Sequence, residues 1–347
     1  TPLYQKSREL AQIVEQTDNI RVFKHTAMVG AYTNNLITAF QIGQAEDVFT
    51  ERYLEIRSDS VVVATGCIER PLLFDNNERP GVMQVGCAHR LARTYGLMPG
   101  SEAVFAVGHD LGLEAAVDLF DLGLRIRCVA DIRDDGHDPS LLLALTDRKI
   151  AVLKGWVAAK AHGSKSVQKV TLCTIDGTVK REFSCDLLVA SAGLTPVTGP
   201  FILAQAKMGY DNHTGYFLPM QLPEKMFSAG RVTGINDPDA IAVSGHLAGL
   251  KAAMAAGADL ATAIGEAEKA TSALPGPQRG CKLVTAPVKG RKSFICFDED
   301  ATVKTVKQAV DKGFDVPELV KRFAGVGLGP GQSGIPGHNL PLFIAKY

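Results

Sequence analysis

The sequence predicts an α/β protein of two or three domains, and three observations support this class. The chain has 347 residues, enough for several domains with sizeable cores. Three valines at 61–63 run into Ala64-Thr65-Gly66, a pattern typical of a buried strand whose end lets another group approach the backbone. A strand, a glycine-containing turn, a helix and a second strand follow one another over 103–130, as in a βαβ unit.

Composition and charge give no sign of a nucleic-acid or membrane partner. The 37 Lys and Arg residues balance 37 Asp and Glu residues, so the chain has no excess of basic residues for an anionic partner. It contains no run of 18 apolar residues and no signal segment, and we expect a cytoplasmic protein. Seven cysteines, odd in number and without C-x-x-C spacing, favour reduced thiols over disulfides or a zinc site: Cys67, Cys87, Cys128, Cys173, Cys185, Cys281 and Cys296.

The N-terminal part predicts one helix and a three-stranded meander. Residues 4–17 carry apolar side chains at helical spacing. Asn34-Asn35 forms the turn of the first predicted hairpin. The sequence starts at Thr1 without Met, which we interpret as the start of a fragment or of a processed product. The three strands are expected at 21–32, 36–42 and 51–56.

The strand at 61–66 is not preceded by the usual phosphate-binding turn. In a dinucleotide-binding domain, a glycine-rich turn binds the pyrophosphate at a helix N-terminus. No such turn occurs before Gly66. We therefore expect the phosphate-binding half of this first domain to lie outside the sequence or to be absent.

The segments that flank the βαβ unit predict a helix and then an antiparallel sheet. Residues 84–98 have a helical pattern that we expect to stop at Pro99-Gly100, with His89 as a surface or packing residue. A short helix is expected at 141–146, and Asp176-Gly177 forms a hairpin turn. The strands around that turn are expected at 150–154, 156–161, 167–175 and 179–183.

The βαβ unit at 103–130 is of the Rossmann type but has an altered turn, Gly108 to Gly112. We place Asp110 where the motif needs a glycine, and its carboxylate would lie beside two phosphates. Like charges about 4 Å apart repel by roughly 4 kcal/mol at an effective dielectric of about 20. Asp131 stands where a ribose-binding acid would be. We expect a structural Rossmann unit that no longer binds a dinucleotide.

Three segments resemble flavoproteins with two dinucleotide-binding domains. Ala64-Thr65-Gly66 with Glu69-Arg70-Pro71 is similar to their crossover, where the backbone lies beside the adenosine of the cofactor. Residues 185–196 are similar to their return from an inserted domain. Ala229-Gly230-Arg231 stands at their last motif, in which an Asp commonly binds the ribityl chain of the flavin. Arg231 cannot accept that hydrogen bond and suits a negatively charged diphosphate better.

The C-terminal part adds the most specific resemblance. A linker over 270–288 is followed by a strand at 293–297, helices at 302–311 and 316–323, and a glycine-rich end. With these segments, the chain resembles the alpha subunit of heterotetrameric sarcosine oxidase. The residues that carry the resemblance are Ala64-Thr65-Gly66, Glu69-Arg70-Pro71, Arg79 to Met83, the turn with Asp110, Ala229-Gly230, Asp300 to Lys304, Gly313-Phe314, Val320 to Phe323 and Gly327 to Gly331.

The resemblance implies two Rossmann-like three-layer domains, one inserted in the other, and a small C-terminal helical domain. The first domain would comprise 1–83 and 183–270, the inserted domain 84–182, and the linker with the small domain 271–347. Similar oxidase and dehydrogenase chains hold a [2Fe–2S] cluster in the small domain with four cysteines. Here Cys296 matches the first cysteine, Asp298 stands at the second and Gly331 falls where a later one would be, so we expect no cluster.

The resemblance also implies a non-catalytic, NAD-binding scaffold within an amine-oxidising complex. A beta subunit would hold FAD and convert sarcosine to glycine, FMN would lie between the subunits, tetrahydrofolate would accept the one-carbon unit, and small gamma and delta subunits would complete the complex. No residue of this chain is predicted to be catalytic or to bind a metal. The predicted cofactor-binding residues are Ala27, Ala64, Thr65, Gly66, Gly193, Leu194, Gly230 and Arg231.

Two other functions stay open at this point. An active FAD-dependent NAD(P)H oxidoreductase is disfavoured by Asp110, Arg231 and the lack of a C-x-x-C pair. An interaction module without a cofactor would fit the missing glycine-rich turn. Cys67 follows the strand-end glycine but has no neighbouring His or Cys in sequence, so we expect it to be packed and unreactive.

Overall fold

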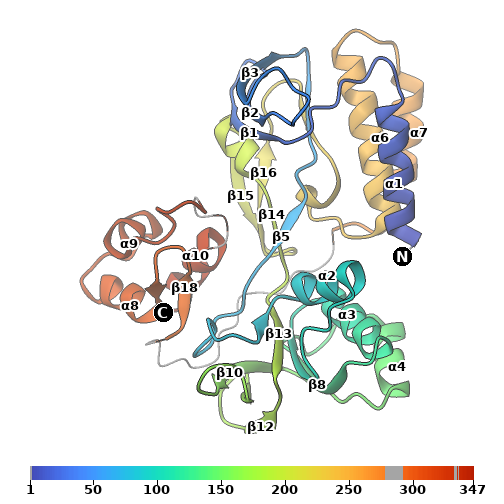
Figure 1. Cartoon of the computed structure of the whole chain (residues 1–347). Helices are drawn as coiled ribbons and strands as arrows, with labels where there is room; N and C mark the ends of the chain where they lie inside the picture. Colours follow the sequence, from blue (N-terminus) through green and yellow to red (C-terminus); the bar gives the residue numbers. More distant parts are fainter. Residues whose placement is uncertain (1, 278–291, 332–333, 335) are drawn as a thin grey trace. The chain divides into compact units, whose positions relative to one another are not determined.

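A computed structural model describes residues 2–277, 292–331, 334 and 336–347 (Figure 1). The chain forms two compact units. Unit 1 comprises Thr1–Cys67, Pro196–Asn212 and Tyr216–Gln278, and unit 2 comprises Ile68–Thr195, His213–Gly215 and Arg279–Tyr347. The expected boundaries at 83 and 183 both fall inside unit 2, because the strand that follows residue 183 pairs within the parallel sheet of that unit.

Unit 1 begins with a helix and an antiparallel meander, as the sequence predicts. The meander has the order β1-β2-β3, and Asn35 adopts a left-handed conformation (φ 55°) in its first turn. Strands β1 and β3 differ in extent from the predicted segments, whereas β2 matches its segment. The elements are α1 (Pro2–Glu15), β1 (Thr26–Ala31), β2 (Leu36–Ile42) and β3 (Glu51–Arg57).

A parallel pair of strands, β4 (Val61–Val63) and β17 (Met226–Ser228), lies at the centre of unit 1. Val63 and Met226 belong to its apolar core. The strand β4 is shorter than predicted and is not buried throughout, because Val62 is 39% exposed. In the described part of the chain, β4 has one strand neighbour.

The rest of unit 1 contains two helices that lie against each other and four shorter elements. The first helix lies close to the Ala/Gly-rich helix that the sequence predicts over 240–256, whereas the second helix and the shorter elements are not predicted from the sequence. Asp237 caps the first helix through its carboxylate, which accepts from the backbone N–H groups of Asp239 and Ala240. The predicted linker over 270–288 begins inside the second helix, which ends at Ser272. Residues 278–288 of this linker lie outside the described residues. These elements are α5 (Gly199–Leu203), β15 (Lys207–Asp211), β16 (Tyr216–Gln221), the 3₁₀ turn η1 (Gly230–Thr233), α6 (Pro238–Ala255) and α7 (Ala261–Ser272).

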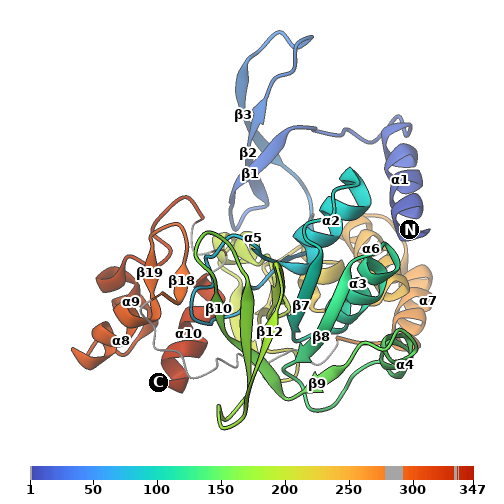
Figure 2. The same cartoon turned by 60° about the horizontal axis from the view of Figure 1, so that its bottom comes forward.

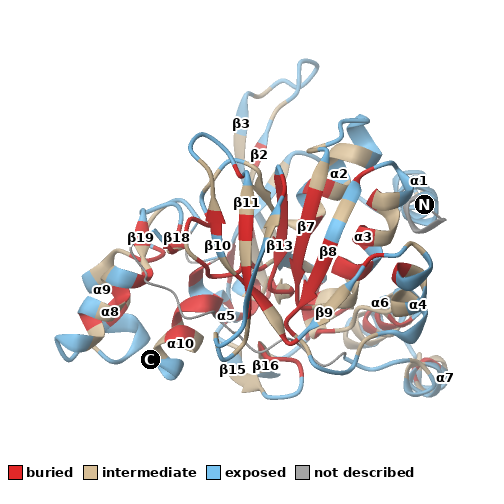
Figure 3. Cartoon of the chain, turned by 90° about the horizontal axis from the view of Figure 1, so that it is seen from below, coloured by how far each residue is buried: buried red, intermediate tan, exposed pale blue. Residues whose placement is uncertain are grey.

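Unit 2 is built on a five-stranded parallel sheet with the order β6-β13-β7-β8-β9. From β7 the chain moves outward to β8 and β9, and it returns to β13 on the other side of β7. Strands β7, β8 and β13 are buried along most of their length (Figure 3). The strands are β6 (Val82–Met83), β7 (Glu102–Val107), β8 (Arg125–Asp131), β9 (Val152–Lys154) and β13 (Leu187–Ser191).

Two layers cover the parallel sheet. Helices pack on one face through Leu113, Leu119 and Leu145, and a three-stranded antiparallel sheet packs on the other through Val157, Val170 and Leu172. Figure 2 shows α3 beside β7 and β8. These layers comprise α2 (Val85–Tyr95), α3 (Asp110–Asp121), α4 (Pro139–Asp147), β10 (Trp156–His162), β11 (Lys169–Thr174) and β12 (Lys180–Ser184).

Two helix boundaries in unit 2 differ from the predicted ones. Helix α2 ends at Gly96, which adopts a left-handed conformation (φ 64°), and does not continue to Pro99. Helix α3 starts at Asp110, so the turn after β7 is shorter than the expected segment 108–112. Two short strands, β5 (Cys67–Glu69) and β14 (Leu194–Pro196), form a two-stranded sheet and contain the points at which the chain passes between the units.

The C-terminal part of unit 2 is a small helical region with its own core, which includes Ile295, Cys296, Val306 and Val320. Its strand and first two helices match the predicted segments closely, whereas the last helix was not predicted. Among the described residues, no helix is long and apolar enough to cross a membrane. The elements are β18 (Phe294–Cys296), β19 (Ala301–Thr302), α8 (Val303–Asp311), α9 (Pro317–Ala324) and α10 (Pro336–Lys346).

Candidate functional site

The candidate site in unit 1 is formed by the ends of two adjacent parallel strands. Val63 and Ser228 are the paired last residues of β4 and β17. The N–H of Ala229 donates to the carbonyl of Val63 (3.0 Å), so both strands end at the same edge. In open α/β sheets, ligands bind outside the carboxyl ends of the strands. The structure thus brings together two segments that lie more than 160 residues apart in the sequence, 64–66 and 229–231.

The segment after β4 presents exposed backbone. Ala64 and Thr65 are exposed, and Gly66 has a left-handed conformation (φ 70°) with open space where a Cβ would be. Two hydrogen bonds fix this segment to one neighbour: the Thr65 hydroxyl donates to the carbonyl of Val197 (2.7 Å), and the N–H of Val197 donates to the carbonyl of Gly66 (2.9 Å). The strand end is therefore held in place and stays accessible to a ligand.

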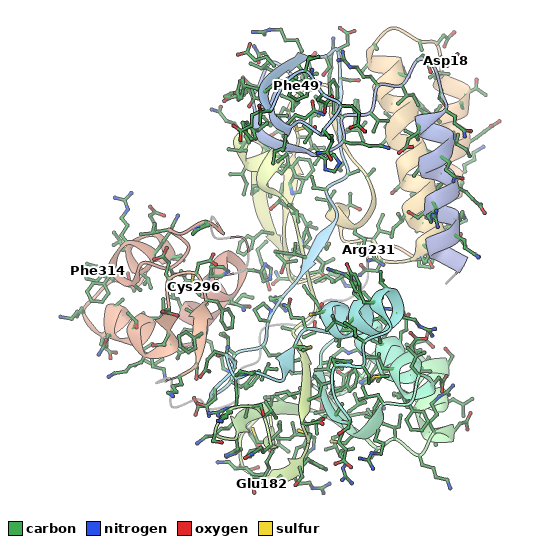
Figure 4. The ribbon with its side chains drawn as sticks, in the orientation of Figure 1. Asp18, Phe49, Glu182, Arg231, Cys296 and Phe314 are labelled. Carbon is green, nitrogen blue, oxygen red and sulfur yellow. The ribbon has the colours of Figure 1, made fainter. Side chains whose placement is uncertain are left out.

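The segment after β17 contributes Gly230 and Arg231. Gly230 also has a positive φ (71°), and its N–H donates to the Ser244 hydroxyl (2.9 Å). Arg231, labelled in Figure 4, is half-buried in η1. Its Nε is buried and has no hydrogen-bond partner within the described chain. A buried guanidinium N–H without a partner is costly, and an anionic ligand would satisfy it.

Cys67 lies beside Arg231 but is not a candidate nucleophile. Its thiol donates to the carbonyl of Arg231 (3.0 Å). Burial raises the pKa of Cys67 to about 12, and the nearby Arg231 charge opposes this only in part. The thiol is therefore protonated at neutral pH, in agreement with the packed and unreactive cysteine expected from the sequence.

The other predicted cofactor-binding residues lie elsewhere. Ala27 is exposed in β1 of the meander. Gly193 and Leu194 belong to unit 2, where the carbonyl of Gly193 accepts from the N–H of Arg70 (2.8 Å). Five of the eight predicted residues, Ala64, Thr65, Gly66, Gly230 and Arg231, follow the two strand ends of unit 1.

Glu69 and Arg70 have structural contacts within unit 2. The Glu69 carboxylate accepts from the N–H groups of Val85 (2.8 Å) and Gly86 (2.7 Å) at the start of α2. A carboxylate at this position satisfies free N–H groups and interacts favourably with the helix dipole. Arg70 is buried and donates from Nη2 to the carbonyl of Ala192 (2.9 Å). The sequence pattern identified the segment but not these contacts.

The βαβ unit of unit 2 carries an ion network in place of an open acidic turn. Asp110 lies at the start of α3, and its Oδ1 is 2.8 Å from Nη2 of Arg133. The same Nη2 lies 2.8 Å from Oδ2 of Asp131, and Nε donates to Oδ1 of Asp131 (3.1 Å). Asp131 is fully buried. Asp110 is therefore an ion-pair partner and not an open carboxylate. Because one arginine is shared by two carboxylates, the group keeps a net negative charge, and the expected repulsion of phosphates stays a prediction.

Cys296, Asp298 and Gly331, the residues at the positions of the [2Fe–2S] cysteines of similar chains, lie in the small helical region. Cys296 is fully buried in an apolar core. The N–H of Gly331 donates to the Asp298 carboxylate (3.0 Å), so the positions matched to a second and a later cysteine are neighbours. In the described part of the chain, no group of three His, Cys, Asp or Glu side chains is placed to hold a metal ion.

The C-terminal region matches a known family, and the whole chain has relatives among oxidase subunits. Residues 290–339 match the family model described as the sarcosine oxidase A3 domain. The alpha subunit of sarcosine oxidase from Corynebacterium sp. (strain U-96) is 29% identical over 92% of this chain and 34% of its own length. One of the opine oxidase subunits of Agrobacterium tumefaciens (strain Ach5) is 25% identical over 80% of this chain and 61% of its own length.

The chain is homologous to a region of the sarcosine oxidase alpha subunit. This homology confirms the resemblance drawn from the sequence. The chain spans about a third of the length of the sarcosine oxidase subunits that it matches, 34% for the Corynebacterium sp. proteins. The relatives are subunits of oxidoreductase complexes, and the chain is similar to one region of them.

Solved structures confirm the α/β fold. The L-proline dehydrogenase of P. horikoshii superposes with a TM-score of 0.76 at 18% identity, over 98% of this chain and 63% of the other. The thioredoxin reductase of T. acidophilum superposes with a TM-score of 0.54 at 16% identity, over 73% of this chain and 79% of the other. The fold thus resembles that of dinucleotide-binding oxidoreductases.

Proposed function

We propose that this chain is a non-catalytic, NAD-binding section of the alpha subunit of a sarcosine oxidase-like complex. Arg231 is the observation that carries this proposal. Its buried Nε lacks a hydrogen-bond partner in the described chain, and it follows the strand end at which such folds bind a dinucleotide. The pyrophosphate or ribose of NAD would supply the missing acceptor.

The residues at the strand ends fit NAD better than FAD. The backbone of Ala64-Thr65-Gly66 would lie beside the adenosine, and the guanidinium of Arg231 would bind the diphosphate. Flavin-binding relatives of this fold use a carboxylate at the position of Arg231, and a guanidinium cannot accept a hydrogen bond. An FAD-dependent NAD(P)H oxidoreductase is therefore the second candidate, and an interaction module without a cofactor is the third.

The homology supports a proposal for the role of this chain within a complex. A flavin-bearing beta subunit would oxidise the N-methyl amine, with sarcosine giving glycine. FMN would lie at the interface of the two subunits, and tetrahydrofolate bound elsewhere in the complex would accept the one-carbon unit. The protein would act in the cytoplasm with beta, gamma and delta subunits, and this chain would contribute the scaffold.

The proposal is tested by identifying the nucleotides that the native complex retains. The complex is purified, denatured, and its released nucleotides are separated by chromatography and identified by mass spectrometry. We expect one NAD⁺ for each alpha subunit, in addition to the flavins of the complex. FAD in place of NAD⁺ in the alpha subunit would support the oxidoreductase alternative, and no nucleotide in the alpha subunit would support the interaction module.

A further inference from the structure

Gly112 fixes the register of the nucleotide-binding motif in unit 2. A Cβ at Gly112 would lie 2.6 Å from Cγ1 and 2.7 Å from Cβ of Val107, so α3 approaches β7 where only glycine fits. Close packing of helix on strand is the role of the third glycine in the G-x-G-x-x-G motif. Counted back from Gly112, the second glycine position falls on His109, one residue before the Asp110 assigned to it from the sequence.

The second glycine position is where the backbone of a nucleotide-binding turn approaches the pyrophosphate. His109 places an imidazole at this point, as the residue that precedes the first turn of α3. The ring is held there, because its Nε2 lies 2.8 Å from the hydroxyl oxygen of Ser191. Its Cδ2 lies 3.9 Å from the place where a Cβ on Gly193 would be. The imidazole thus extends from the end of β7 to the end of β13.

These two strands flank the topological switch point of the sheet. The chain moves from β7 to β8 and β9 on one side and returns to β13 on the other. In open α/β sheets, a ligand binds in the space outside the carboxyl ends of the strands at this reversal. Ser191 is the last residue of β13 and is fully buried. The His109–Ser191 hydrogen bond therefore crosses the position at which this fold binds a nucleotide.

The two carboxylates near His109 are paired within the chain, whereas its own Nδ1 is buried and has no hydrogen-bond partner among the described residues. Arg133 occupies both carboxylates that a nucleotide would meet, Asp131 at the end of β8 and Asp110 at the start of α3. Burial, followed by the charges of Arg133 and Arg70, lowers the pKa of His109 to about 3. The imidazole is neutral at physiological pH and presents no positive charge to a phosphate.

We propose that His109 is a plug residue whose imidazole fills the pyrophosphate position of unit 2 and excludes nicotinamide and flavin dinucleotides from it. The exclusion is steric. The turn keeps the close contact between α3 and β7 that the motif requires, so the imidazole itself is what occupies the space of the pyrophosphate. Nucleotide binding by this chain is then confined to other parts of the molecule. The plug acts within unit 2 alone, whether or not unit 1 binds NAD.

The experiment compares His109→Gly with the wild-type chain, with NADH and NADPH as probes. Hydrogen exchange measured by mass spectrometry reports on the backbone amides of residues 107–112, so a nucleotide bound in unit 1 does not interfere. We expect no nucleotide-dependent protection of these amides in the wild type at millimolar nucleotide. In His109→Gly we expect protection with at least one of the two probes, and an affinity at this site at least tenfold above that of the wild type.

Ser191→Ala is the matched control, because it removes the hydrogen bond but leaves the imidazole in the turn. It should bind nucleotide in unit 2 no better than the wild type. Protection of residues 107–112 in the wild type would overturn the proposal, and so would a folded His109→Gly chain that gains no affinity. If His109→Gly does not fold, His109→Ala is held to the same criterion, and the wild-type exchange experiment can still contradict the proposal.

Discussion

The two units differ in what lies at the carboxyl ends of their parallel strands: exposed backbone in unit 1 and a hydrogen-bonded side chain in unit 2. In unit 1, Ala64 and Thr65 are exposed, Gly66 has no side chain, and a buried nitrogen of Arg231 lacks a partner in the described chain. In unit 2, His109 is hydrogen-bonded across the switch point, and one arginine pairs with both nearby carboxylates. At the first edge, a buried N–H of an arginine lacks an acceptor among the described residues. At the second edge, both carboxylates are paired with an arginine of the same unit, although Nδ1 of His109 also lacks a partner among the described residues.

The difference shows that a shared fold does not give two equivalent sites. Function depends on which polar groups a strand edge leaves unsatisfied and on which side chains occupy its ligand position. Arginine appears at both edges with opposite effects. Arg133 compensates buried carboxylates, whereas Nε of Arg231 has no acceptor among the described residues.

The largest expected effect comes from removing the internal counter-ion of unit 2. Arg133→Ala leaves the fully buried carboxylate of Asp131 without its guanidinium partner. Breaking a buried pair by removing one partner typically costs about 3–5 kcal/mol. We expect a loss of this size in the free energy of unfolding of unit 2, measured by urea denaturation at pH 7.

Arg127→Ala provides the control for that measurement. Arg127 pairs with Glu102 (2.6 Å), but half of its side chain is exposed. Surface pairs contribute about 0–1 kcal/mol, so this variant should lose far less stability. Equal losses for the two variants would show that the Arg133 network is no more than a surface ion pair.

The next effect concerns nucleotide binding at the strand ends of unit 1. Arg231→Ala should weaken NAD⁺ retention by about 1–3 kcal/mol, the range of a hydrogen bond to a charged group. The measurement is the NAD⁺ content of the purified complex after dialysis. Arg57→Ala, an exposed arginine at the end of β3, should retain the wild-type content. Unchanged NAD⁺ occupancy in Arg231→Ala would remove the main support for the proposed function.

The strand ends of unit 1 could be predicted because their sequence signal is local. Valines followed by small residues and glycine indicate a strand that stops at a ligand edge, and 61–66 and 226–231 both show a form of this pattern. The resemblance assigned both segments to one domain, and their pairing as neighbouring parallel strands is a finding of the structure. The unpartnered Nε of Arg231 could not be predicted, because burial of one atom depends on tertiary packing.

The register of the turn in unit 2 needed information that the sequence does not contain. Gly108 and Gly112 both occur there, and only the contact of Gly112 with Val107 identifies the packing glycine. Arg133 lies 23 residues after Asp110, and nothing in the sequence pairs them. Helix α10 was not predicted, and it contains Pro341, a residue type that normally argues against a helix interior.

A smaller effect is the dependence of the free energy of unfolding on pH that His109 in unit 2 introduces. The folded-state pKa of His109 lies near 3, below its ordinary value of 6.5. Between these values the unfolded chain binds a proton that the folded chain does not, so stability falls as pH decreases from 6.5. One such proton is worth about 1 kcal/mol for each pH unit between pH 6 and 5.

His109→Asn removes this titration and serves as the test. The free energy of unfolding, measured by urea denaturation at several pH values, should fall with pH less steeply in the variant than in the wild type. The other histidines with a lowered pKa, such as His338 and His162, act equally in both proteins and cancel in the comparison. Identical slopes would mean that His109 is solvated and titrates normally, which is incompatible with a buried plug.

The smallest expected effect is the loss of stability on removing Asp110, the more exposed of the two carboxylates that share Arg133. Asp110 is about a quarter exposed (23%), whereas Asp131 is fully buried and accepts two hydrogen bonds from the same guanidinium. Asp110→Asn leaves the buried pair intact, so we expect a loss of only about 0.2–1 kcal/mol in the free energy of unfolding. A loss as large as that of Arg133→Ala would instead make Asp110 the principal partner. In that case the turn itself, and not the end of β8, would be the part of unit 2 that depends on the internal arginine.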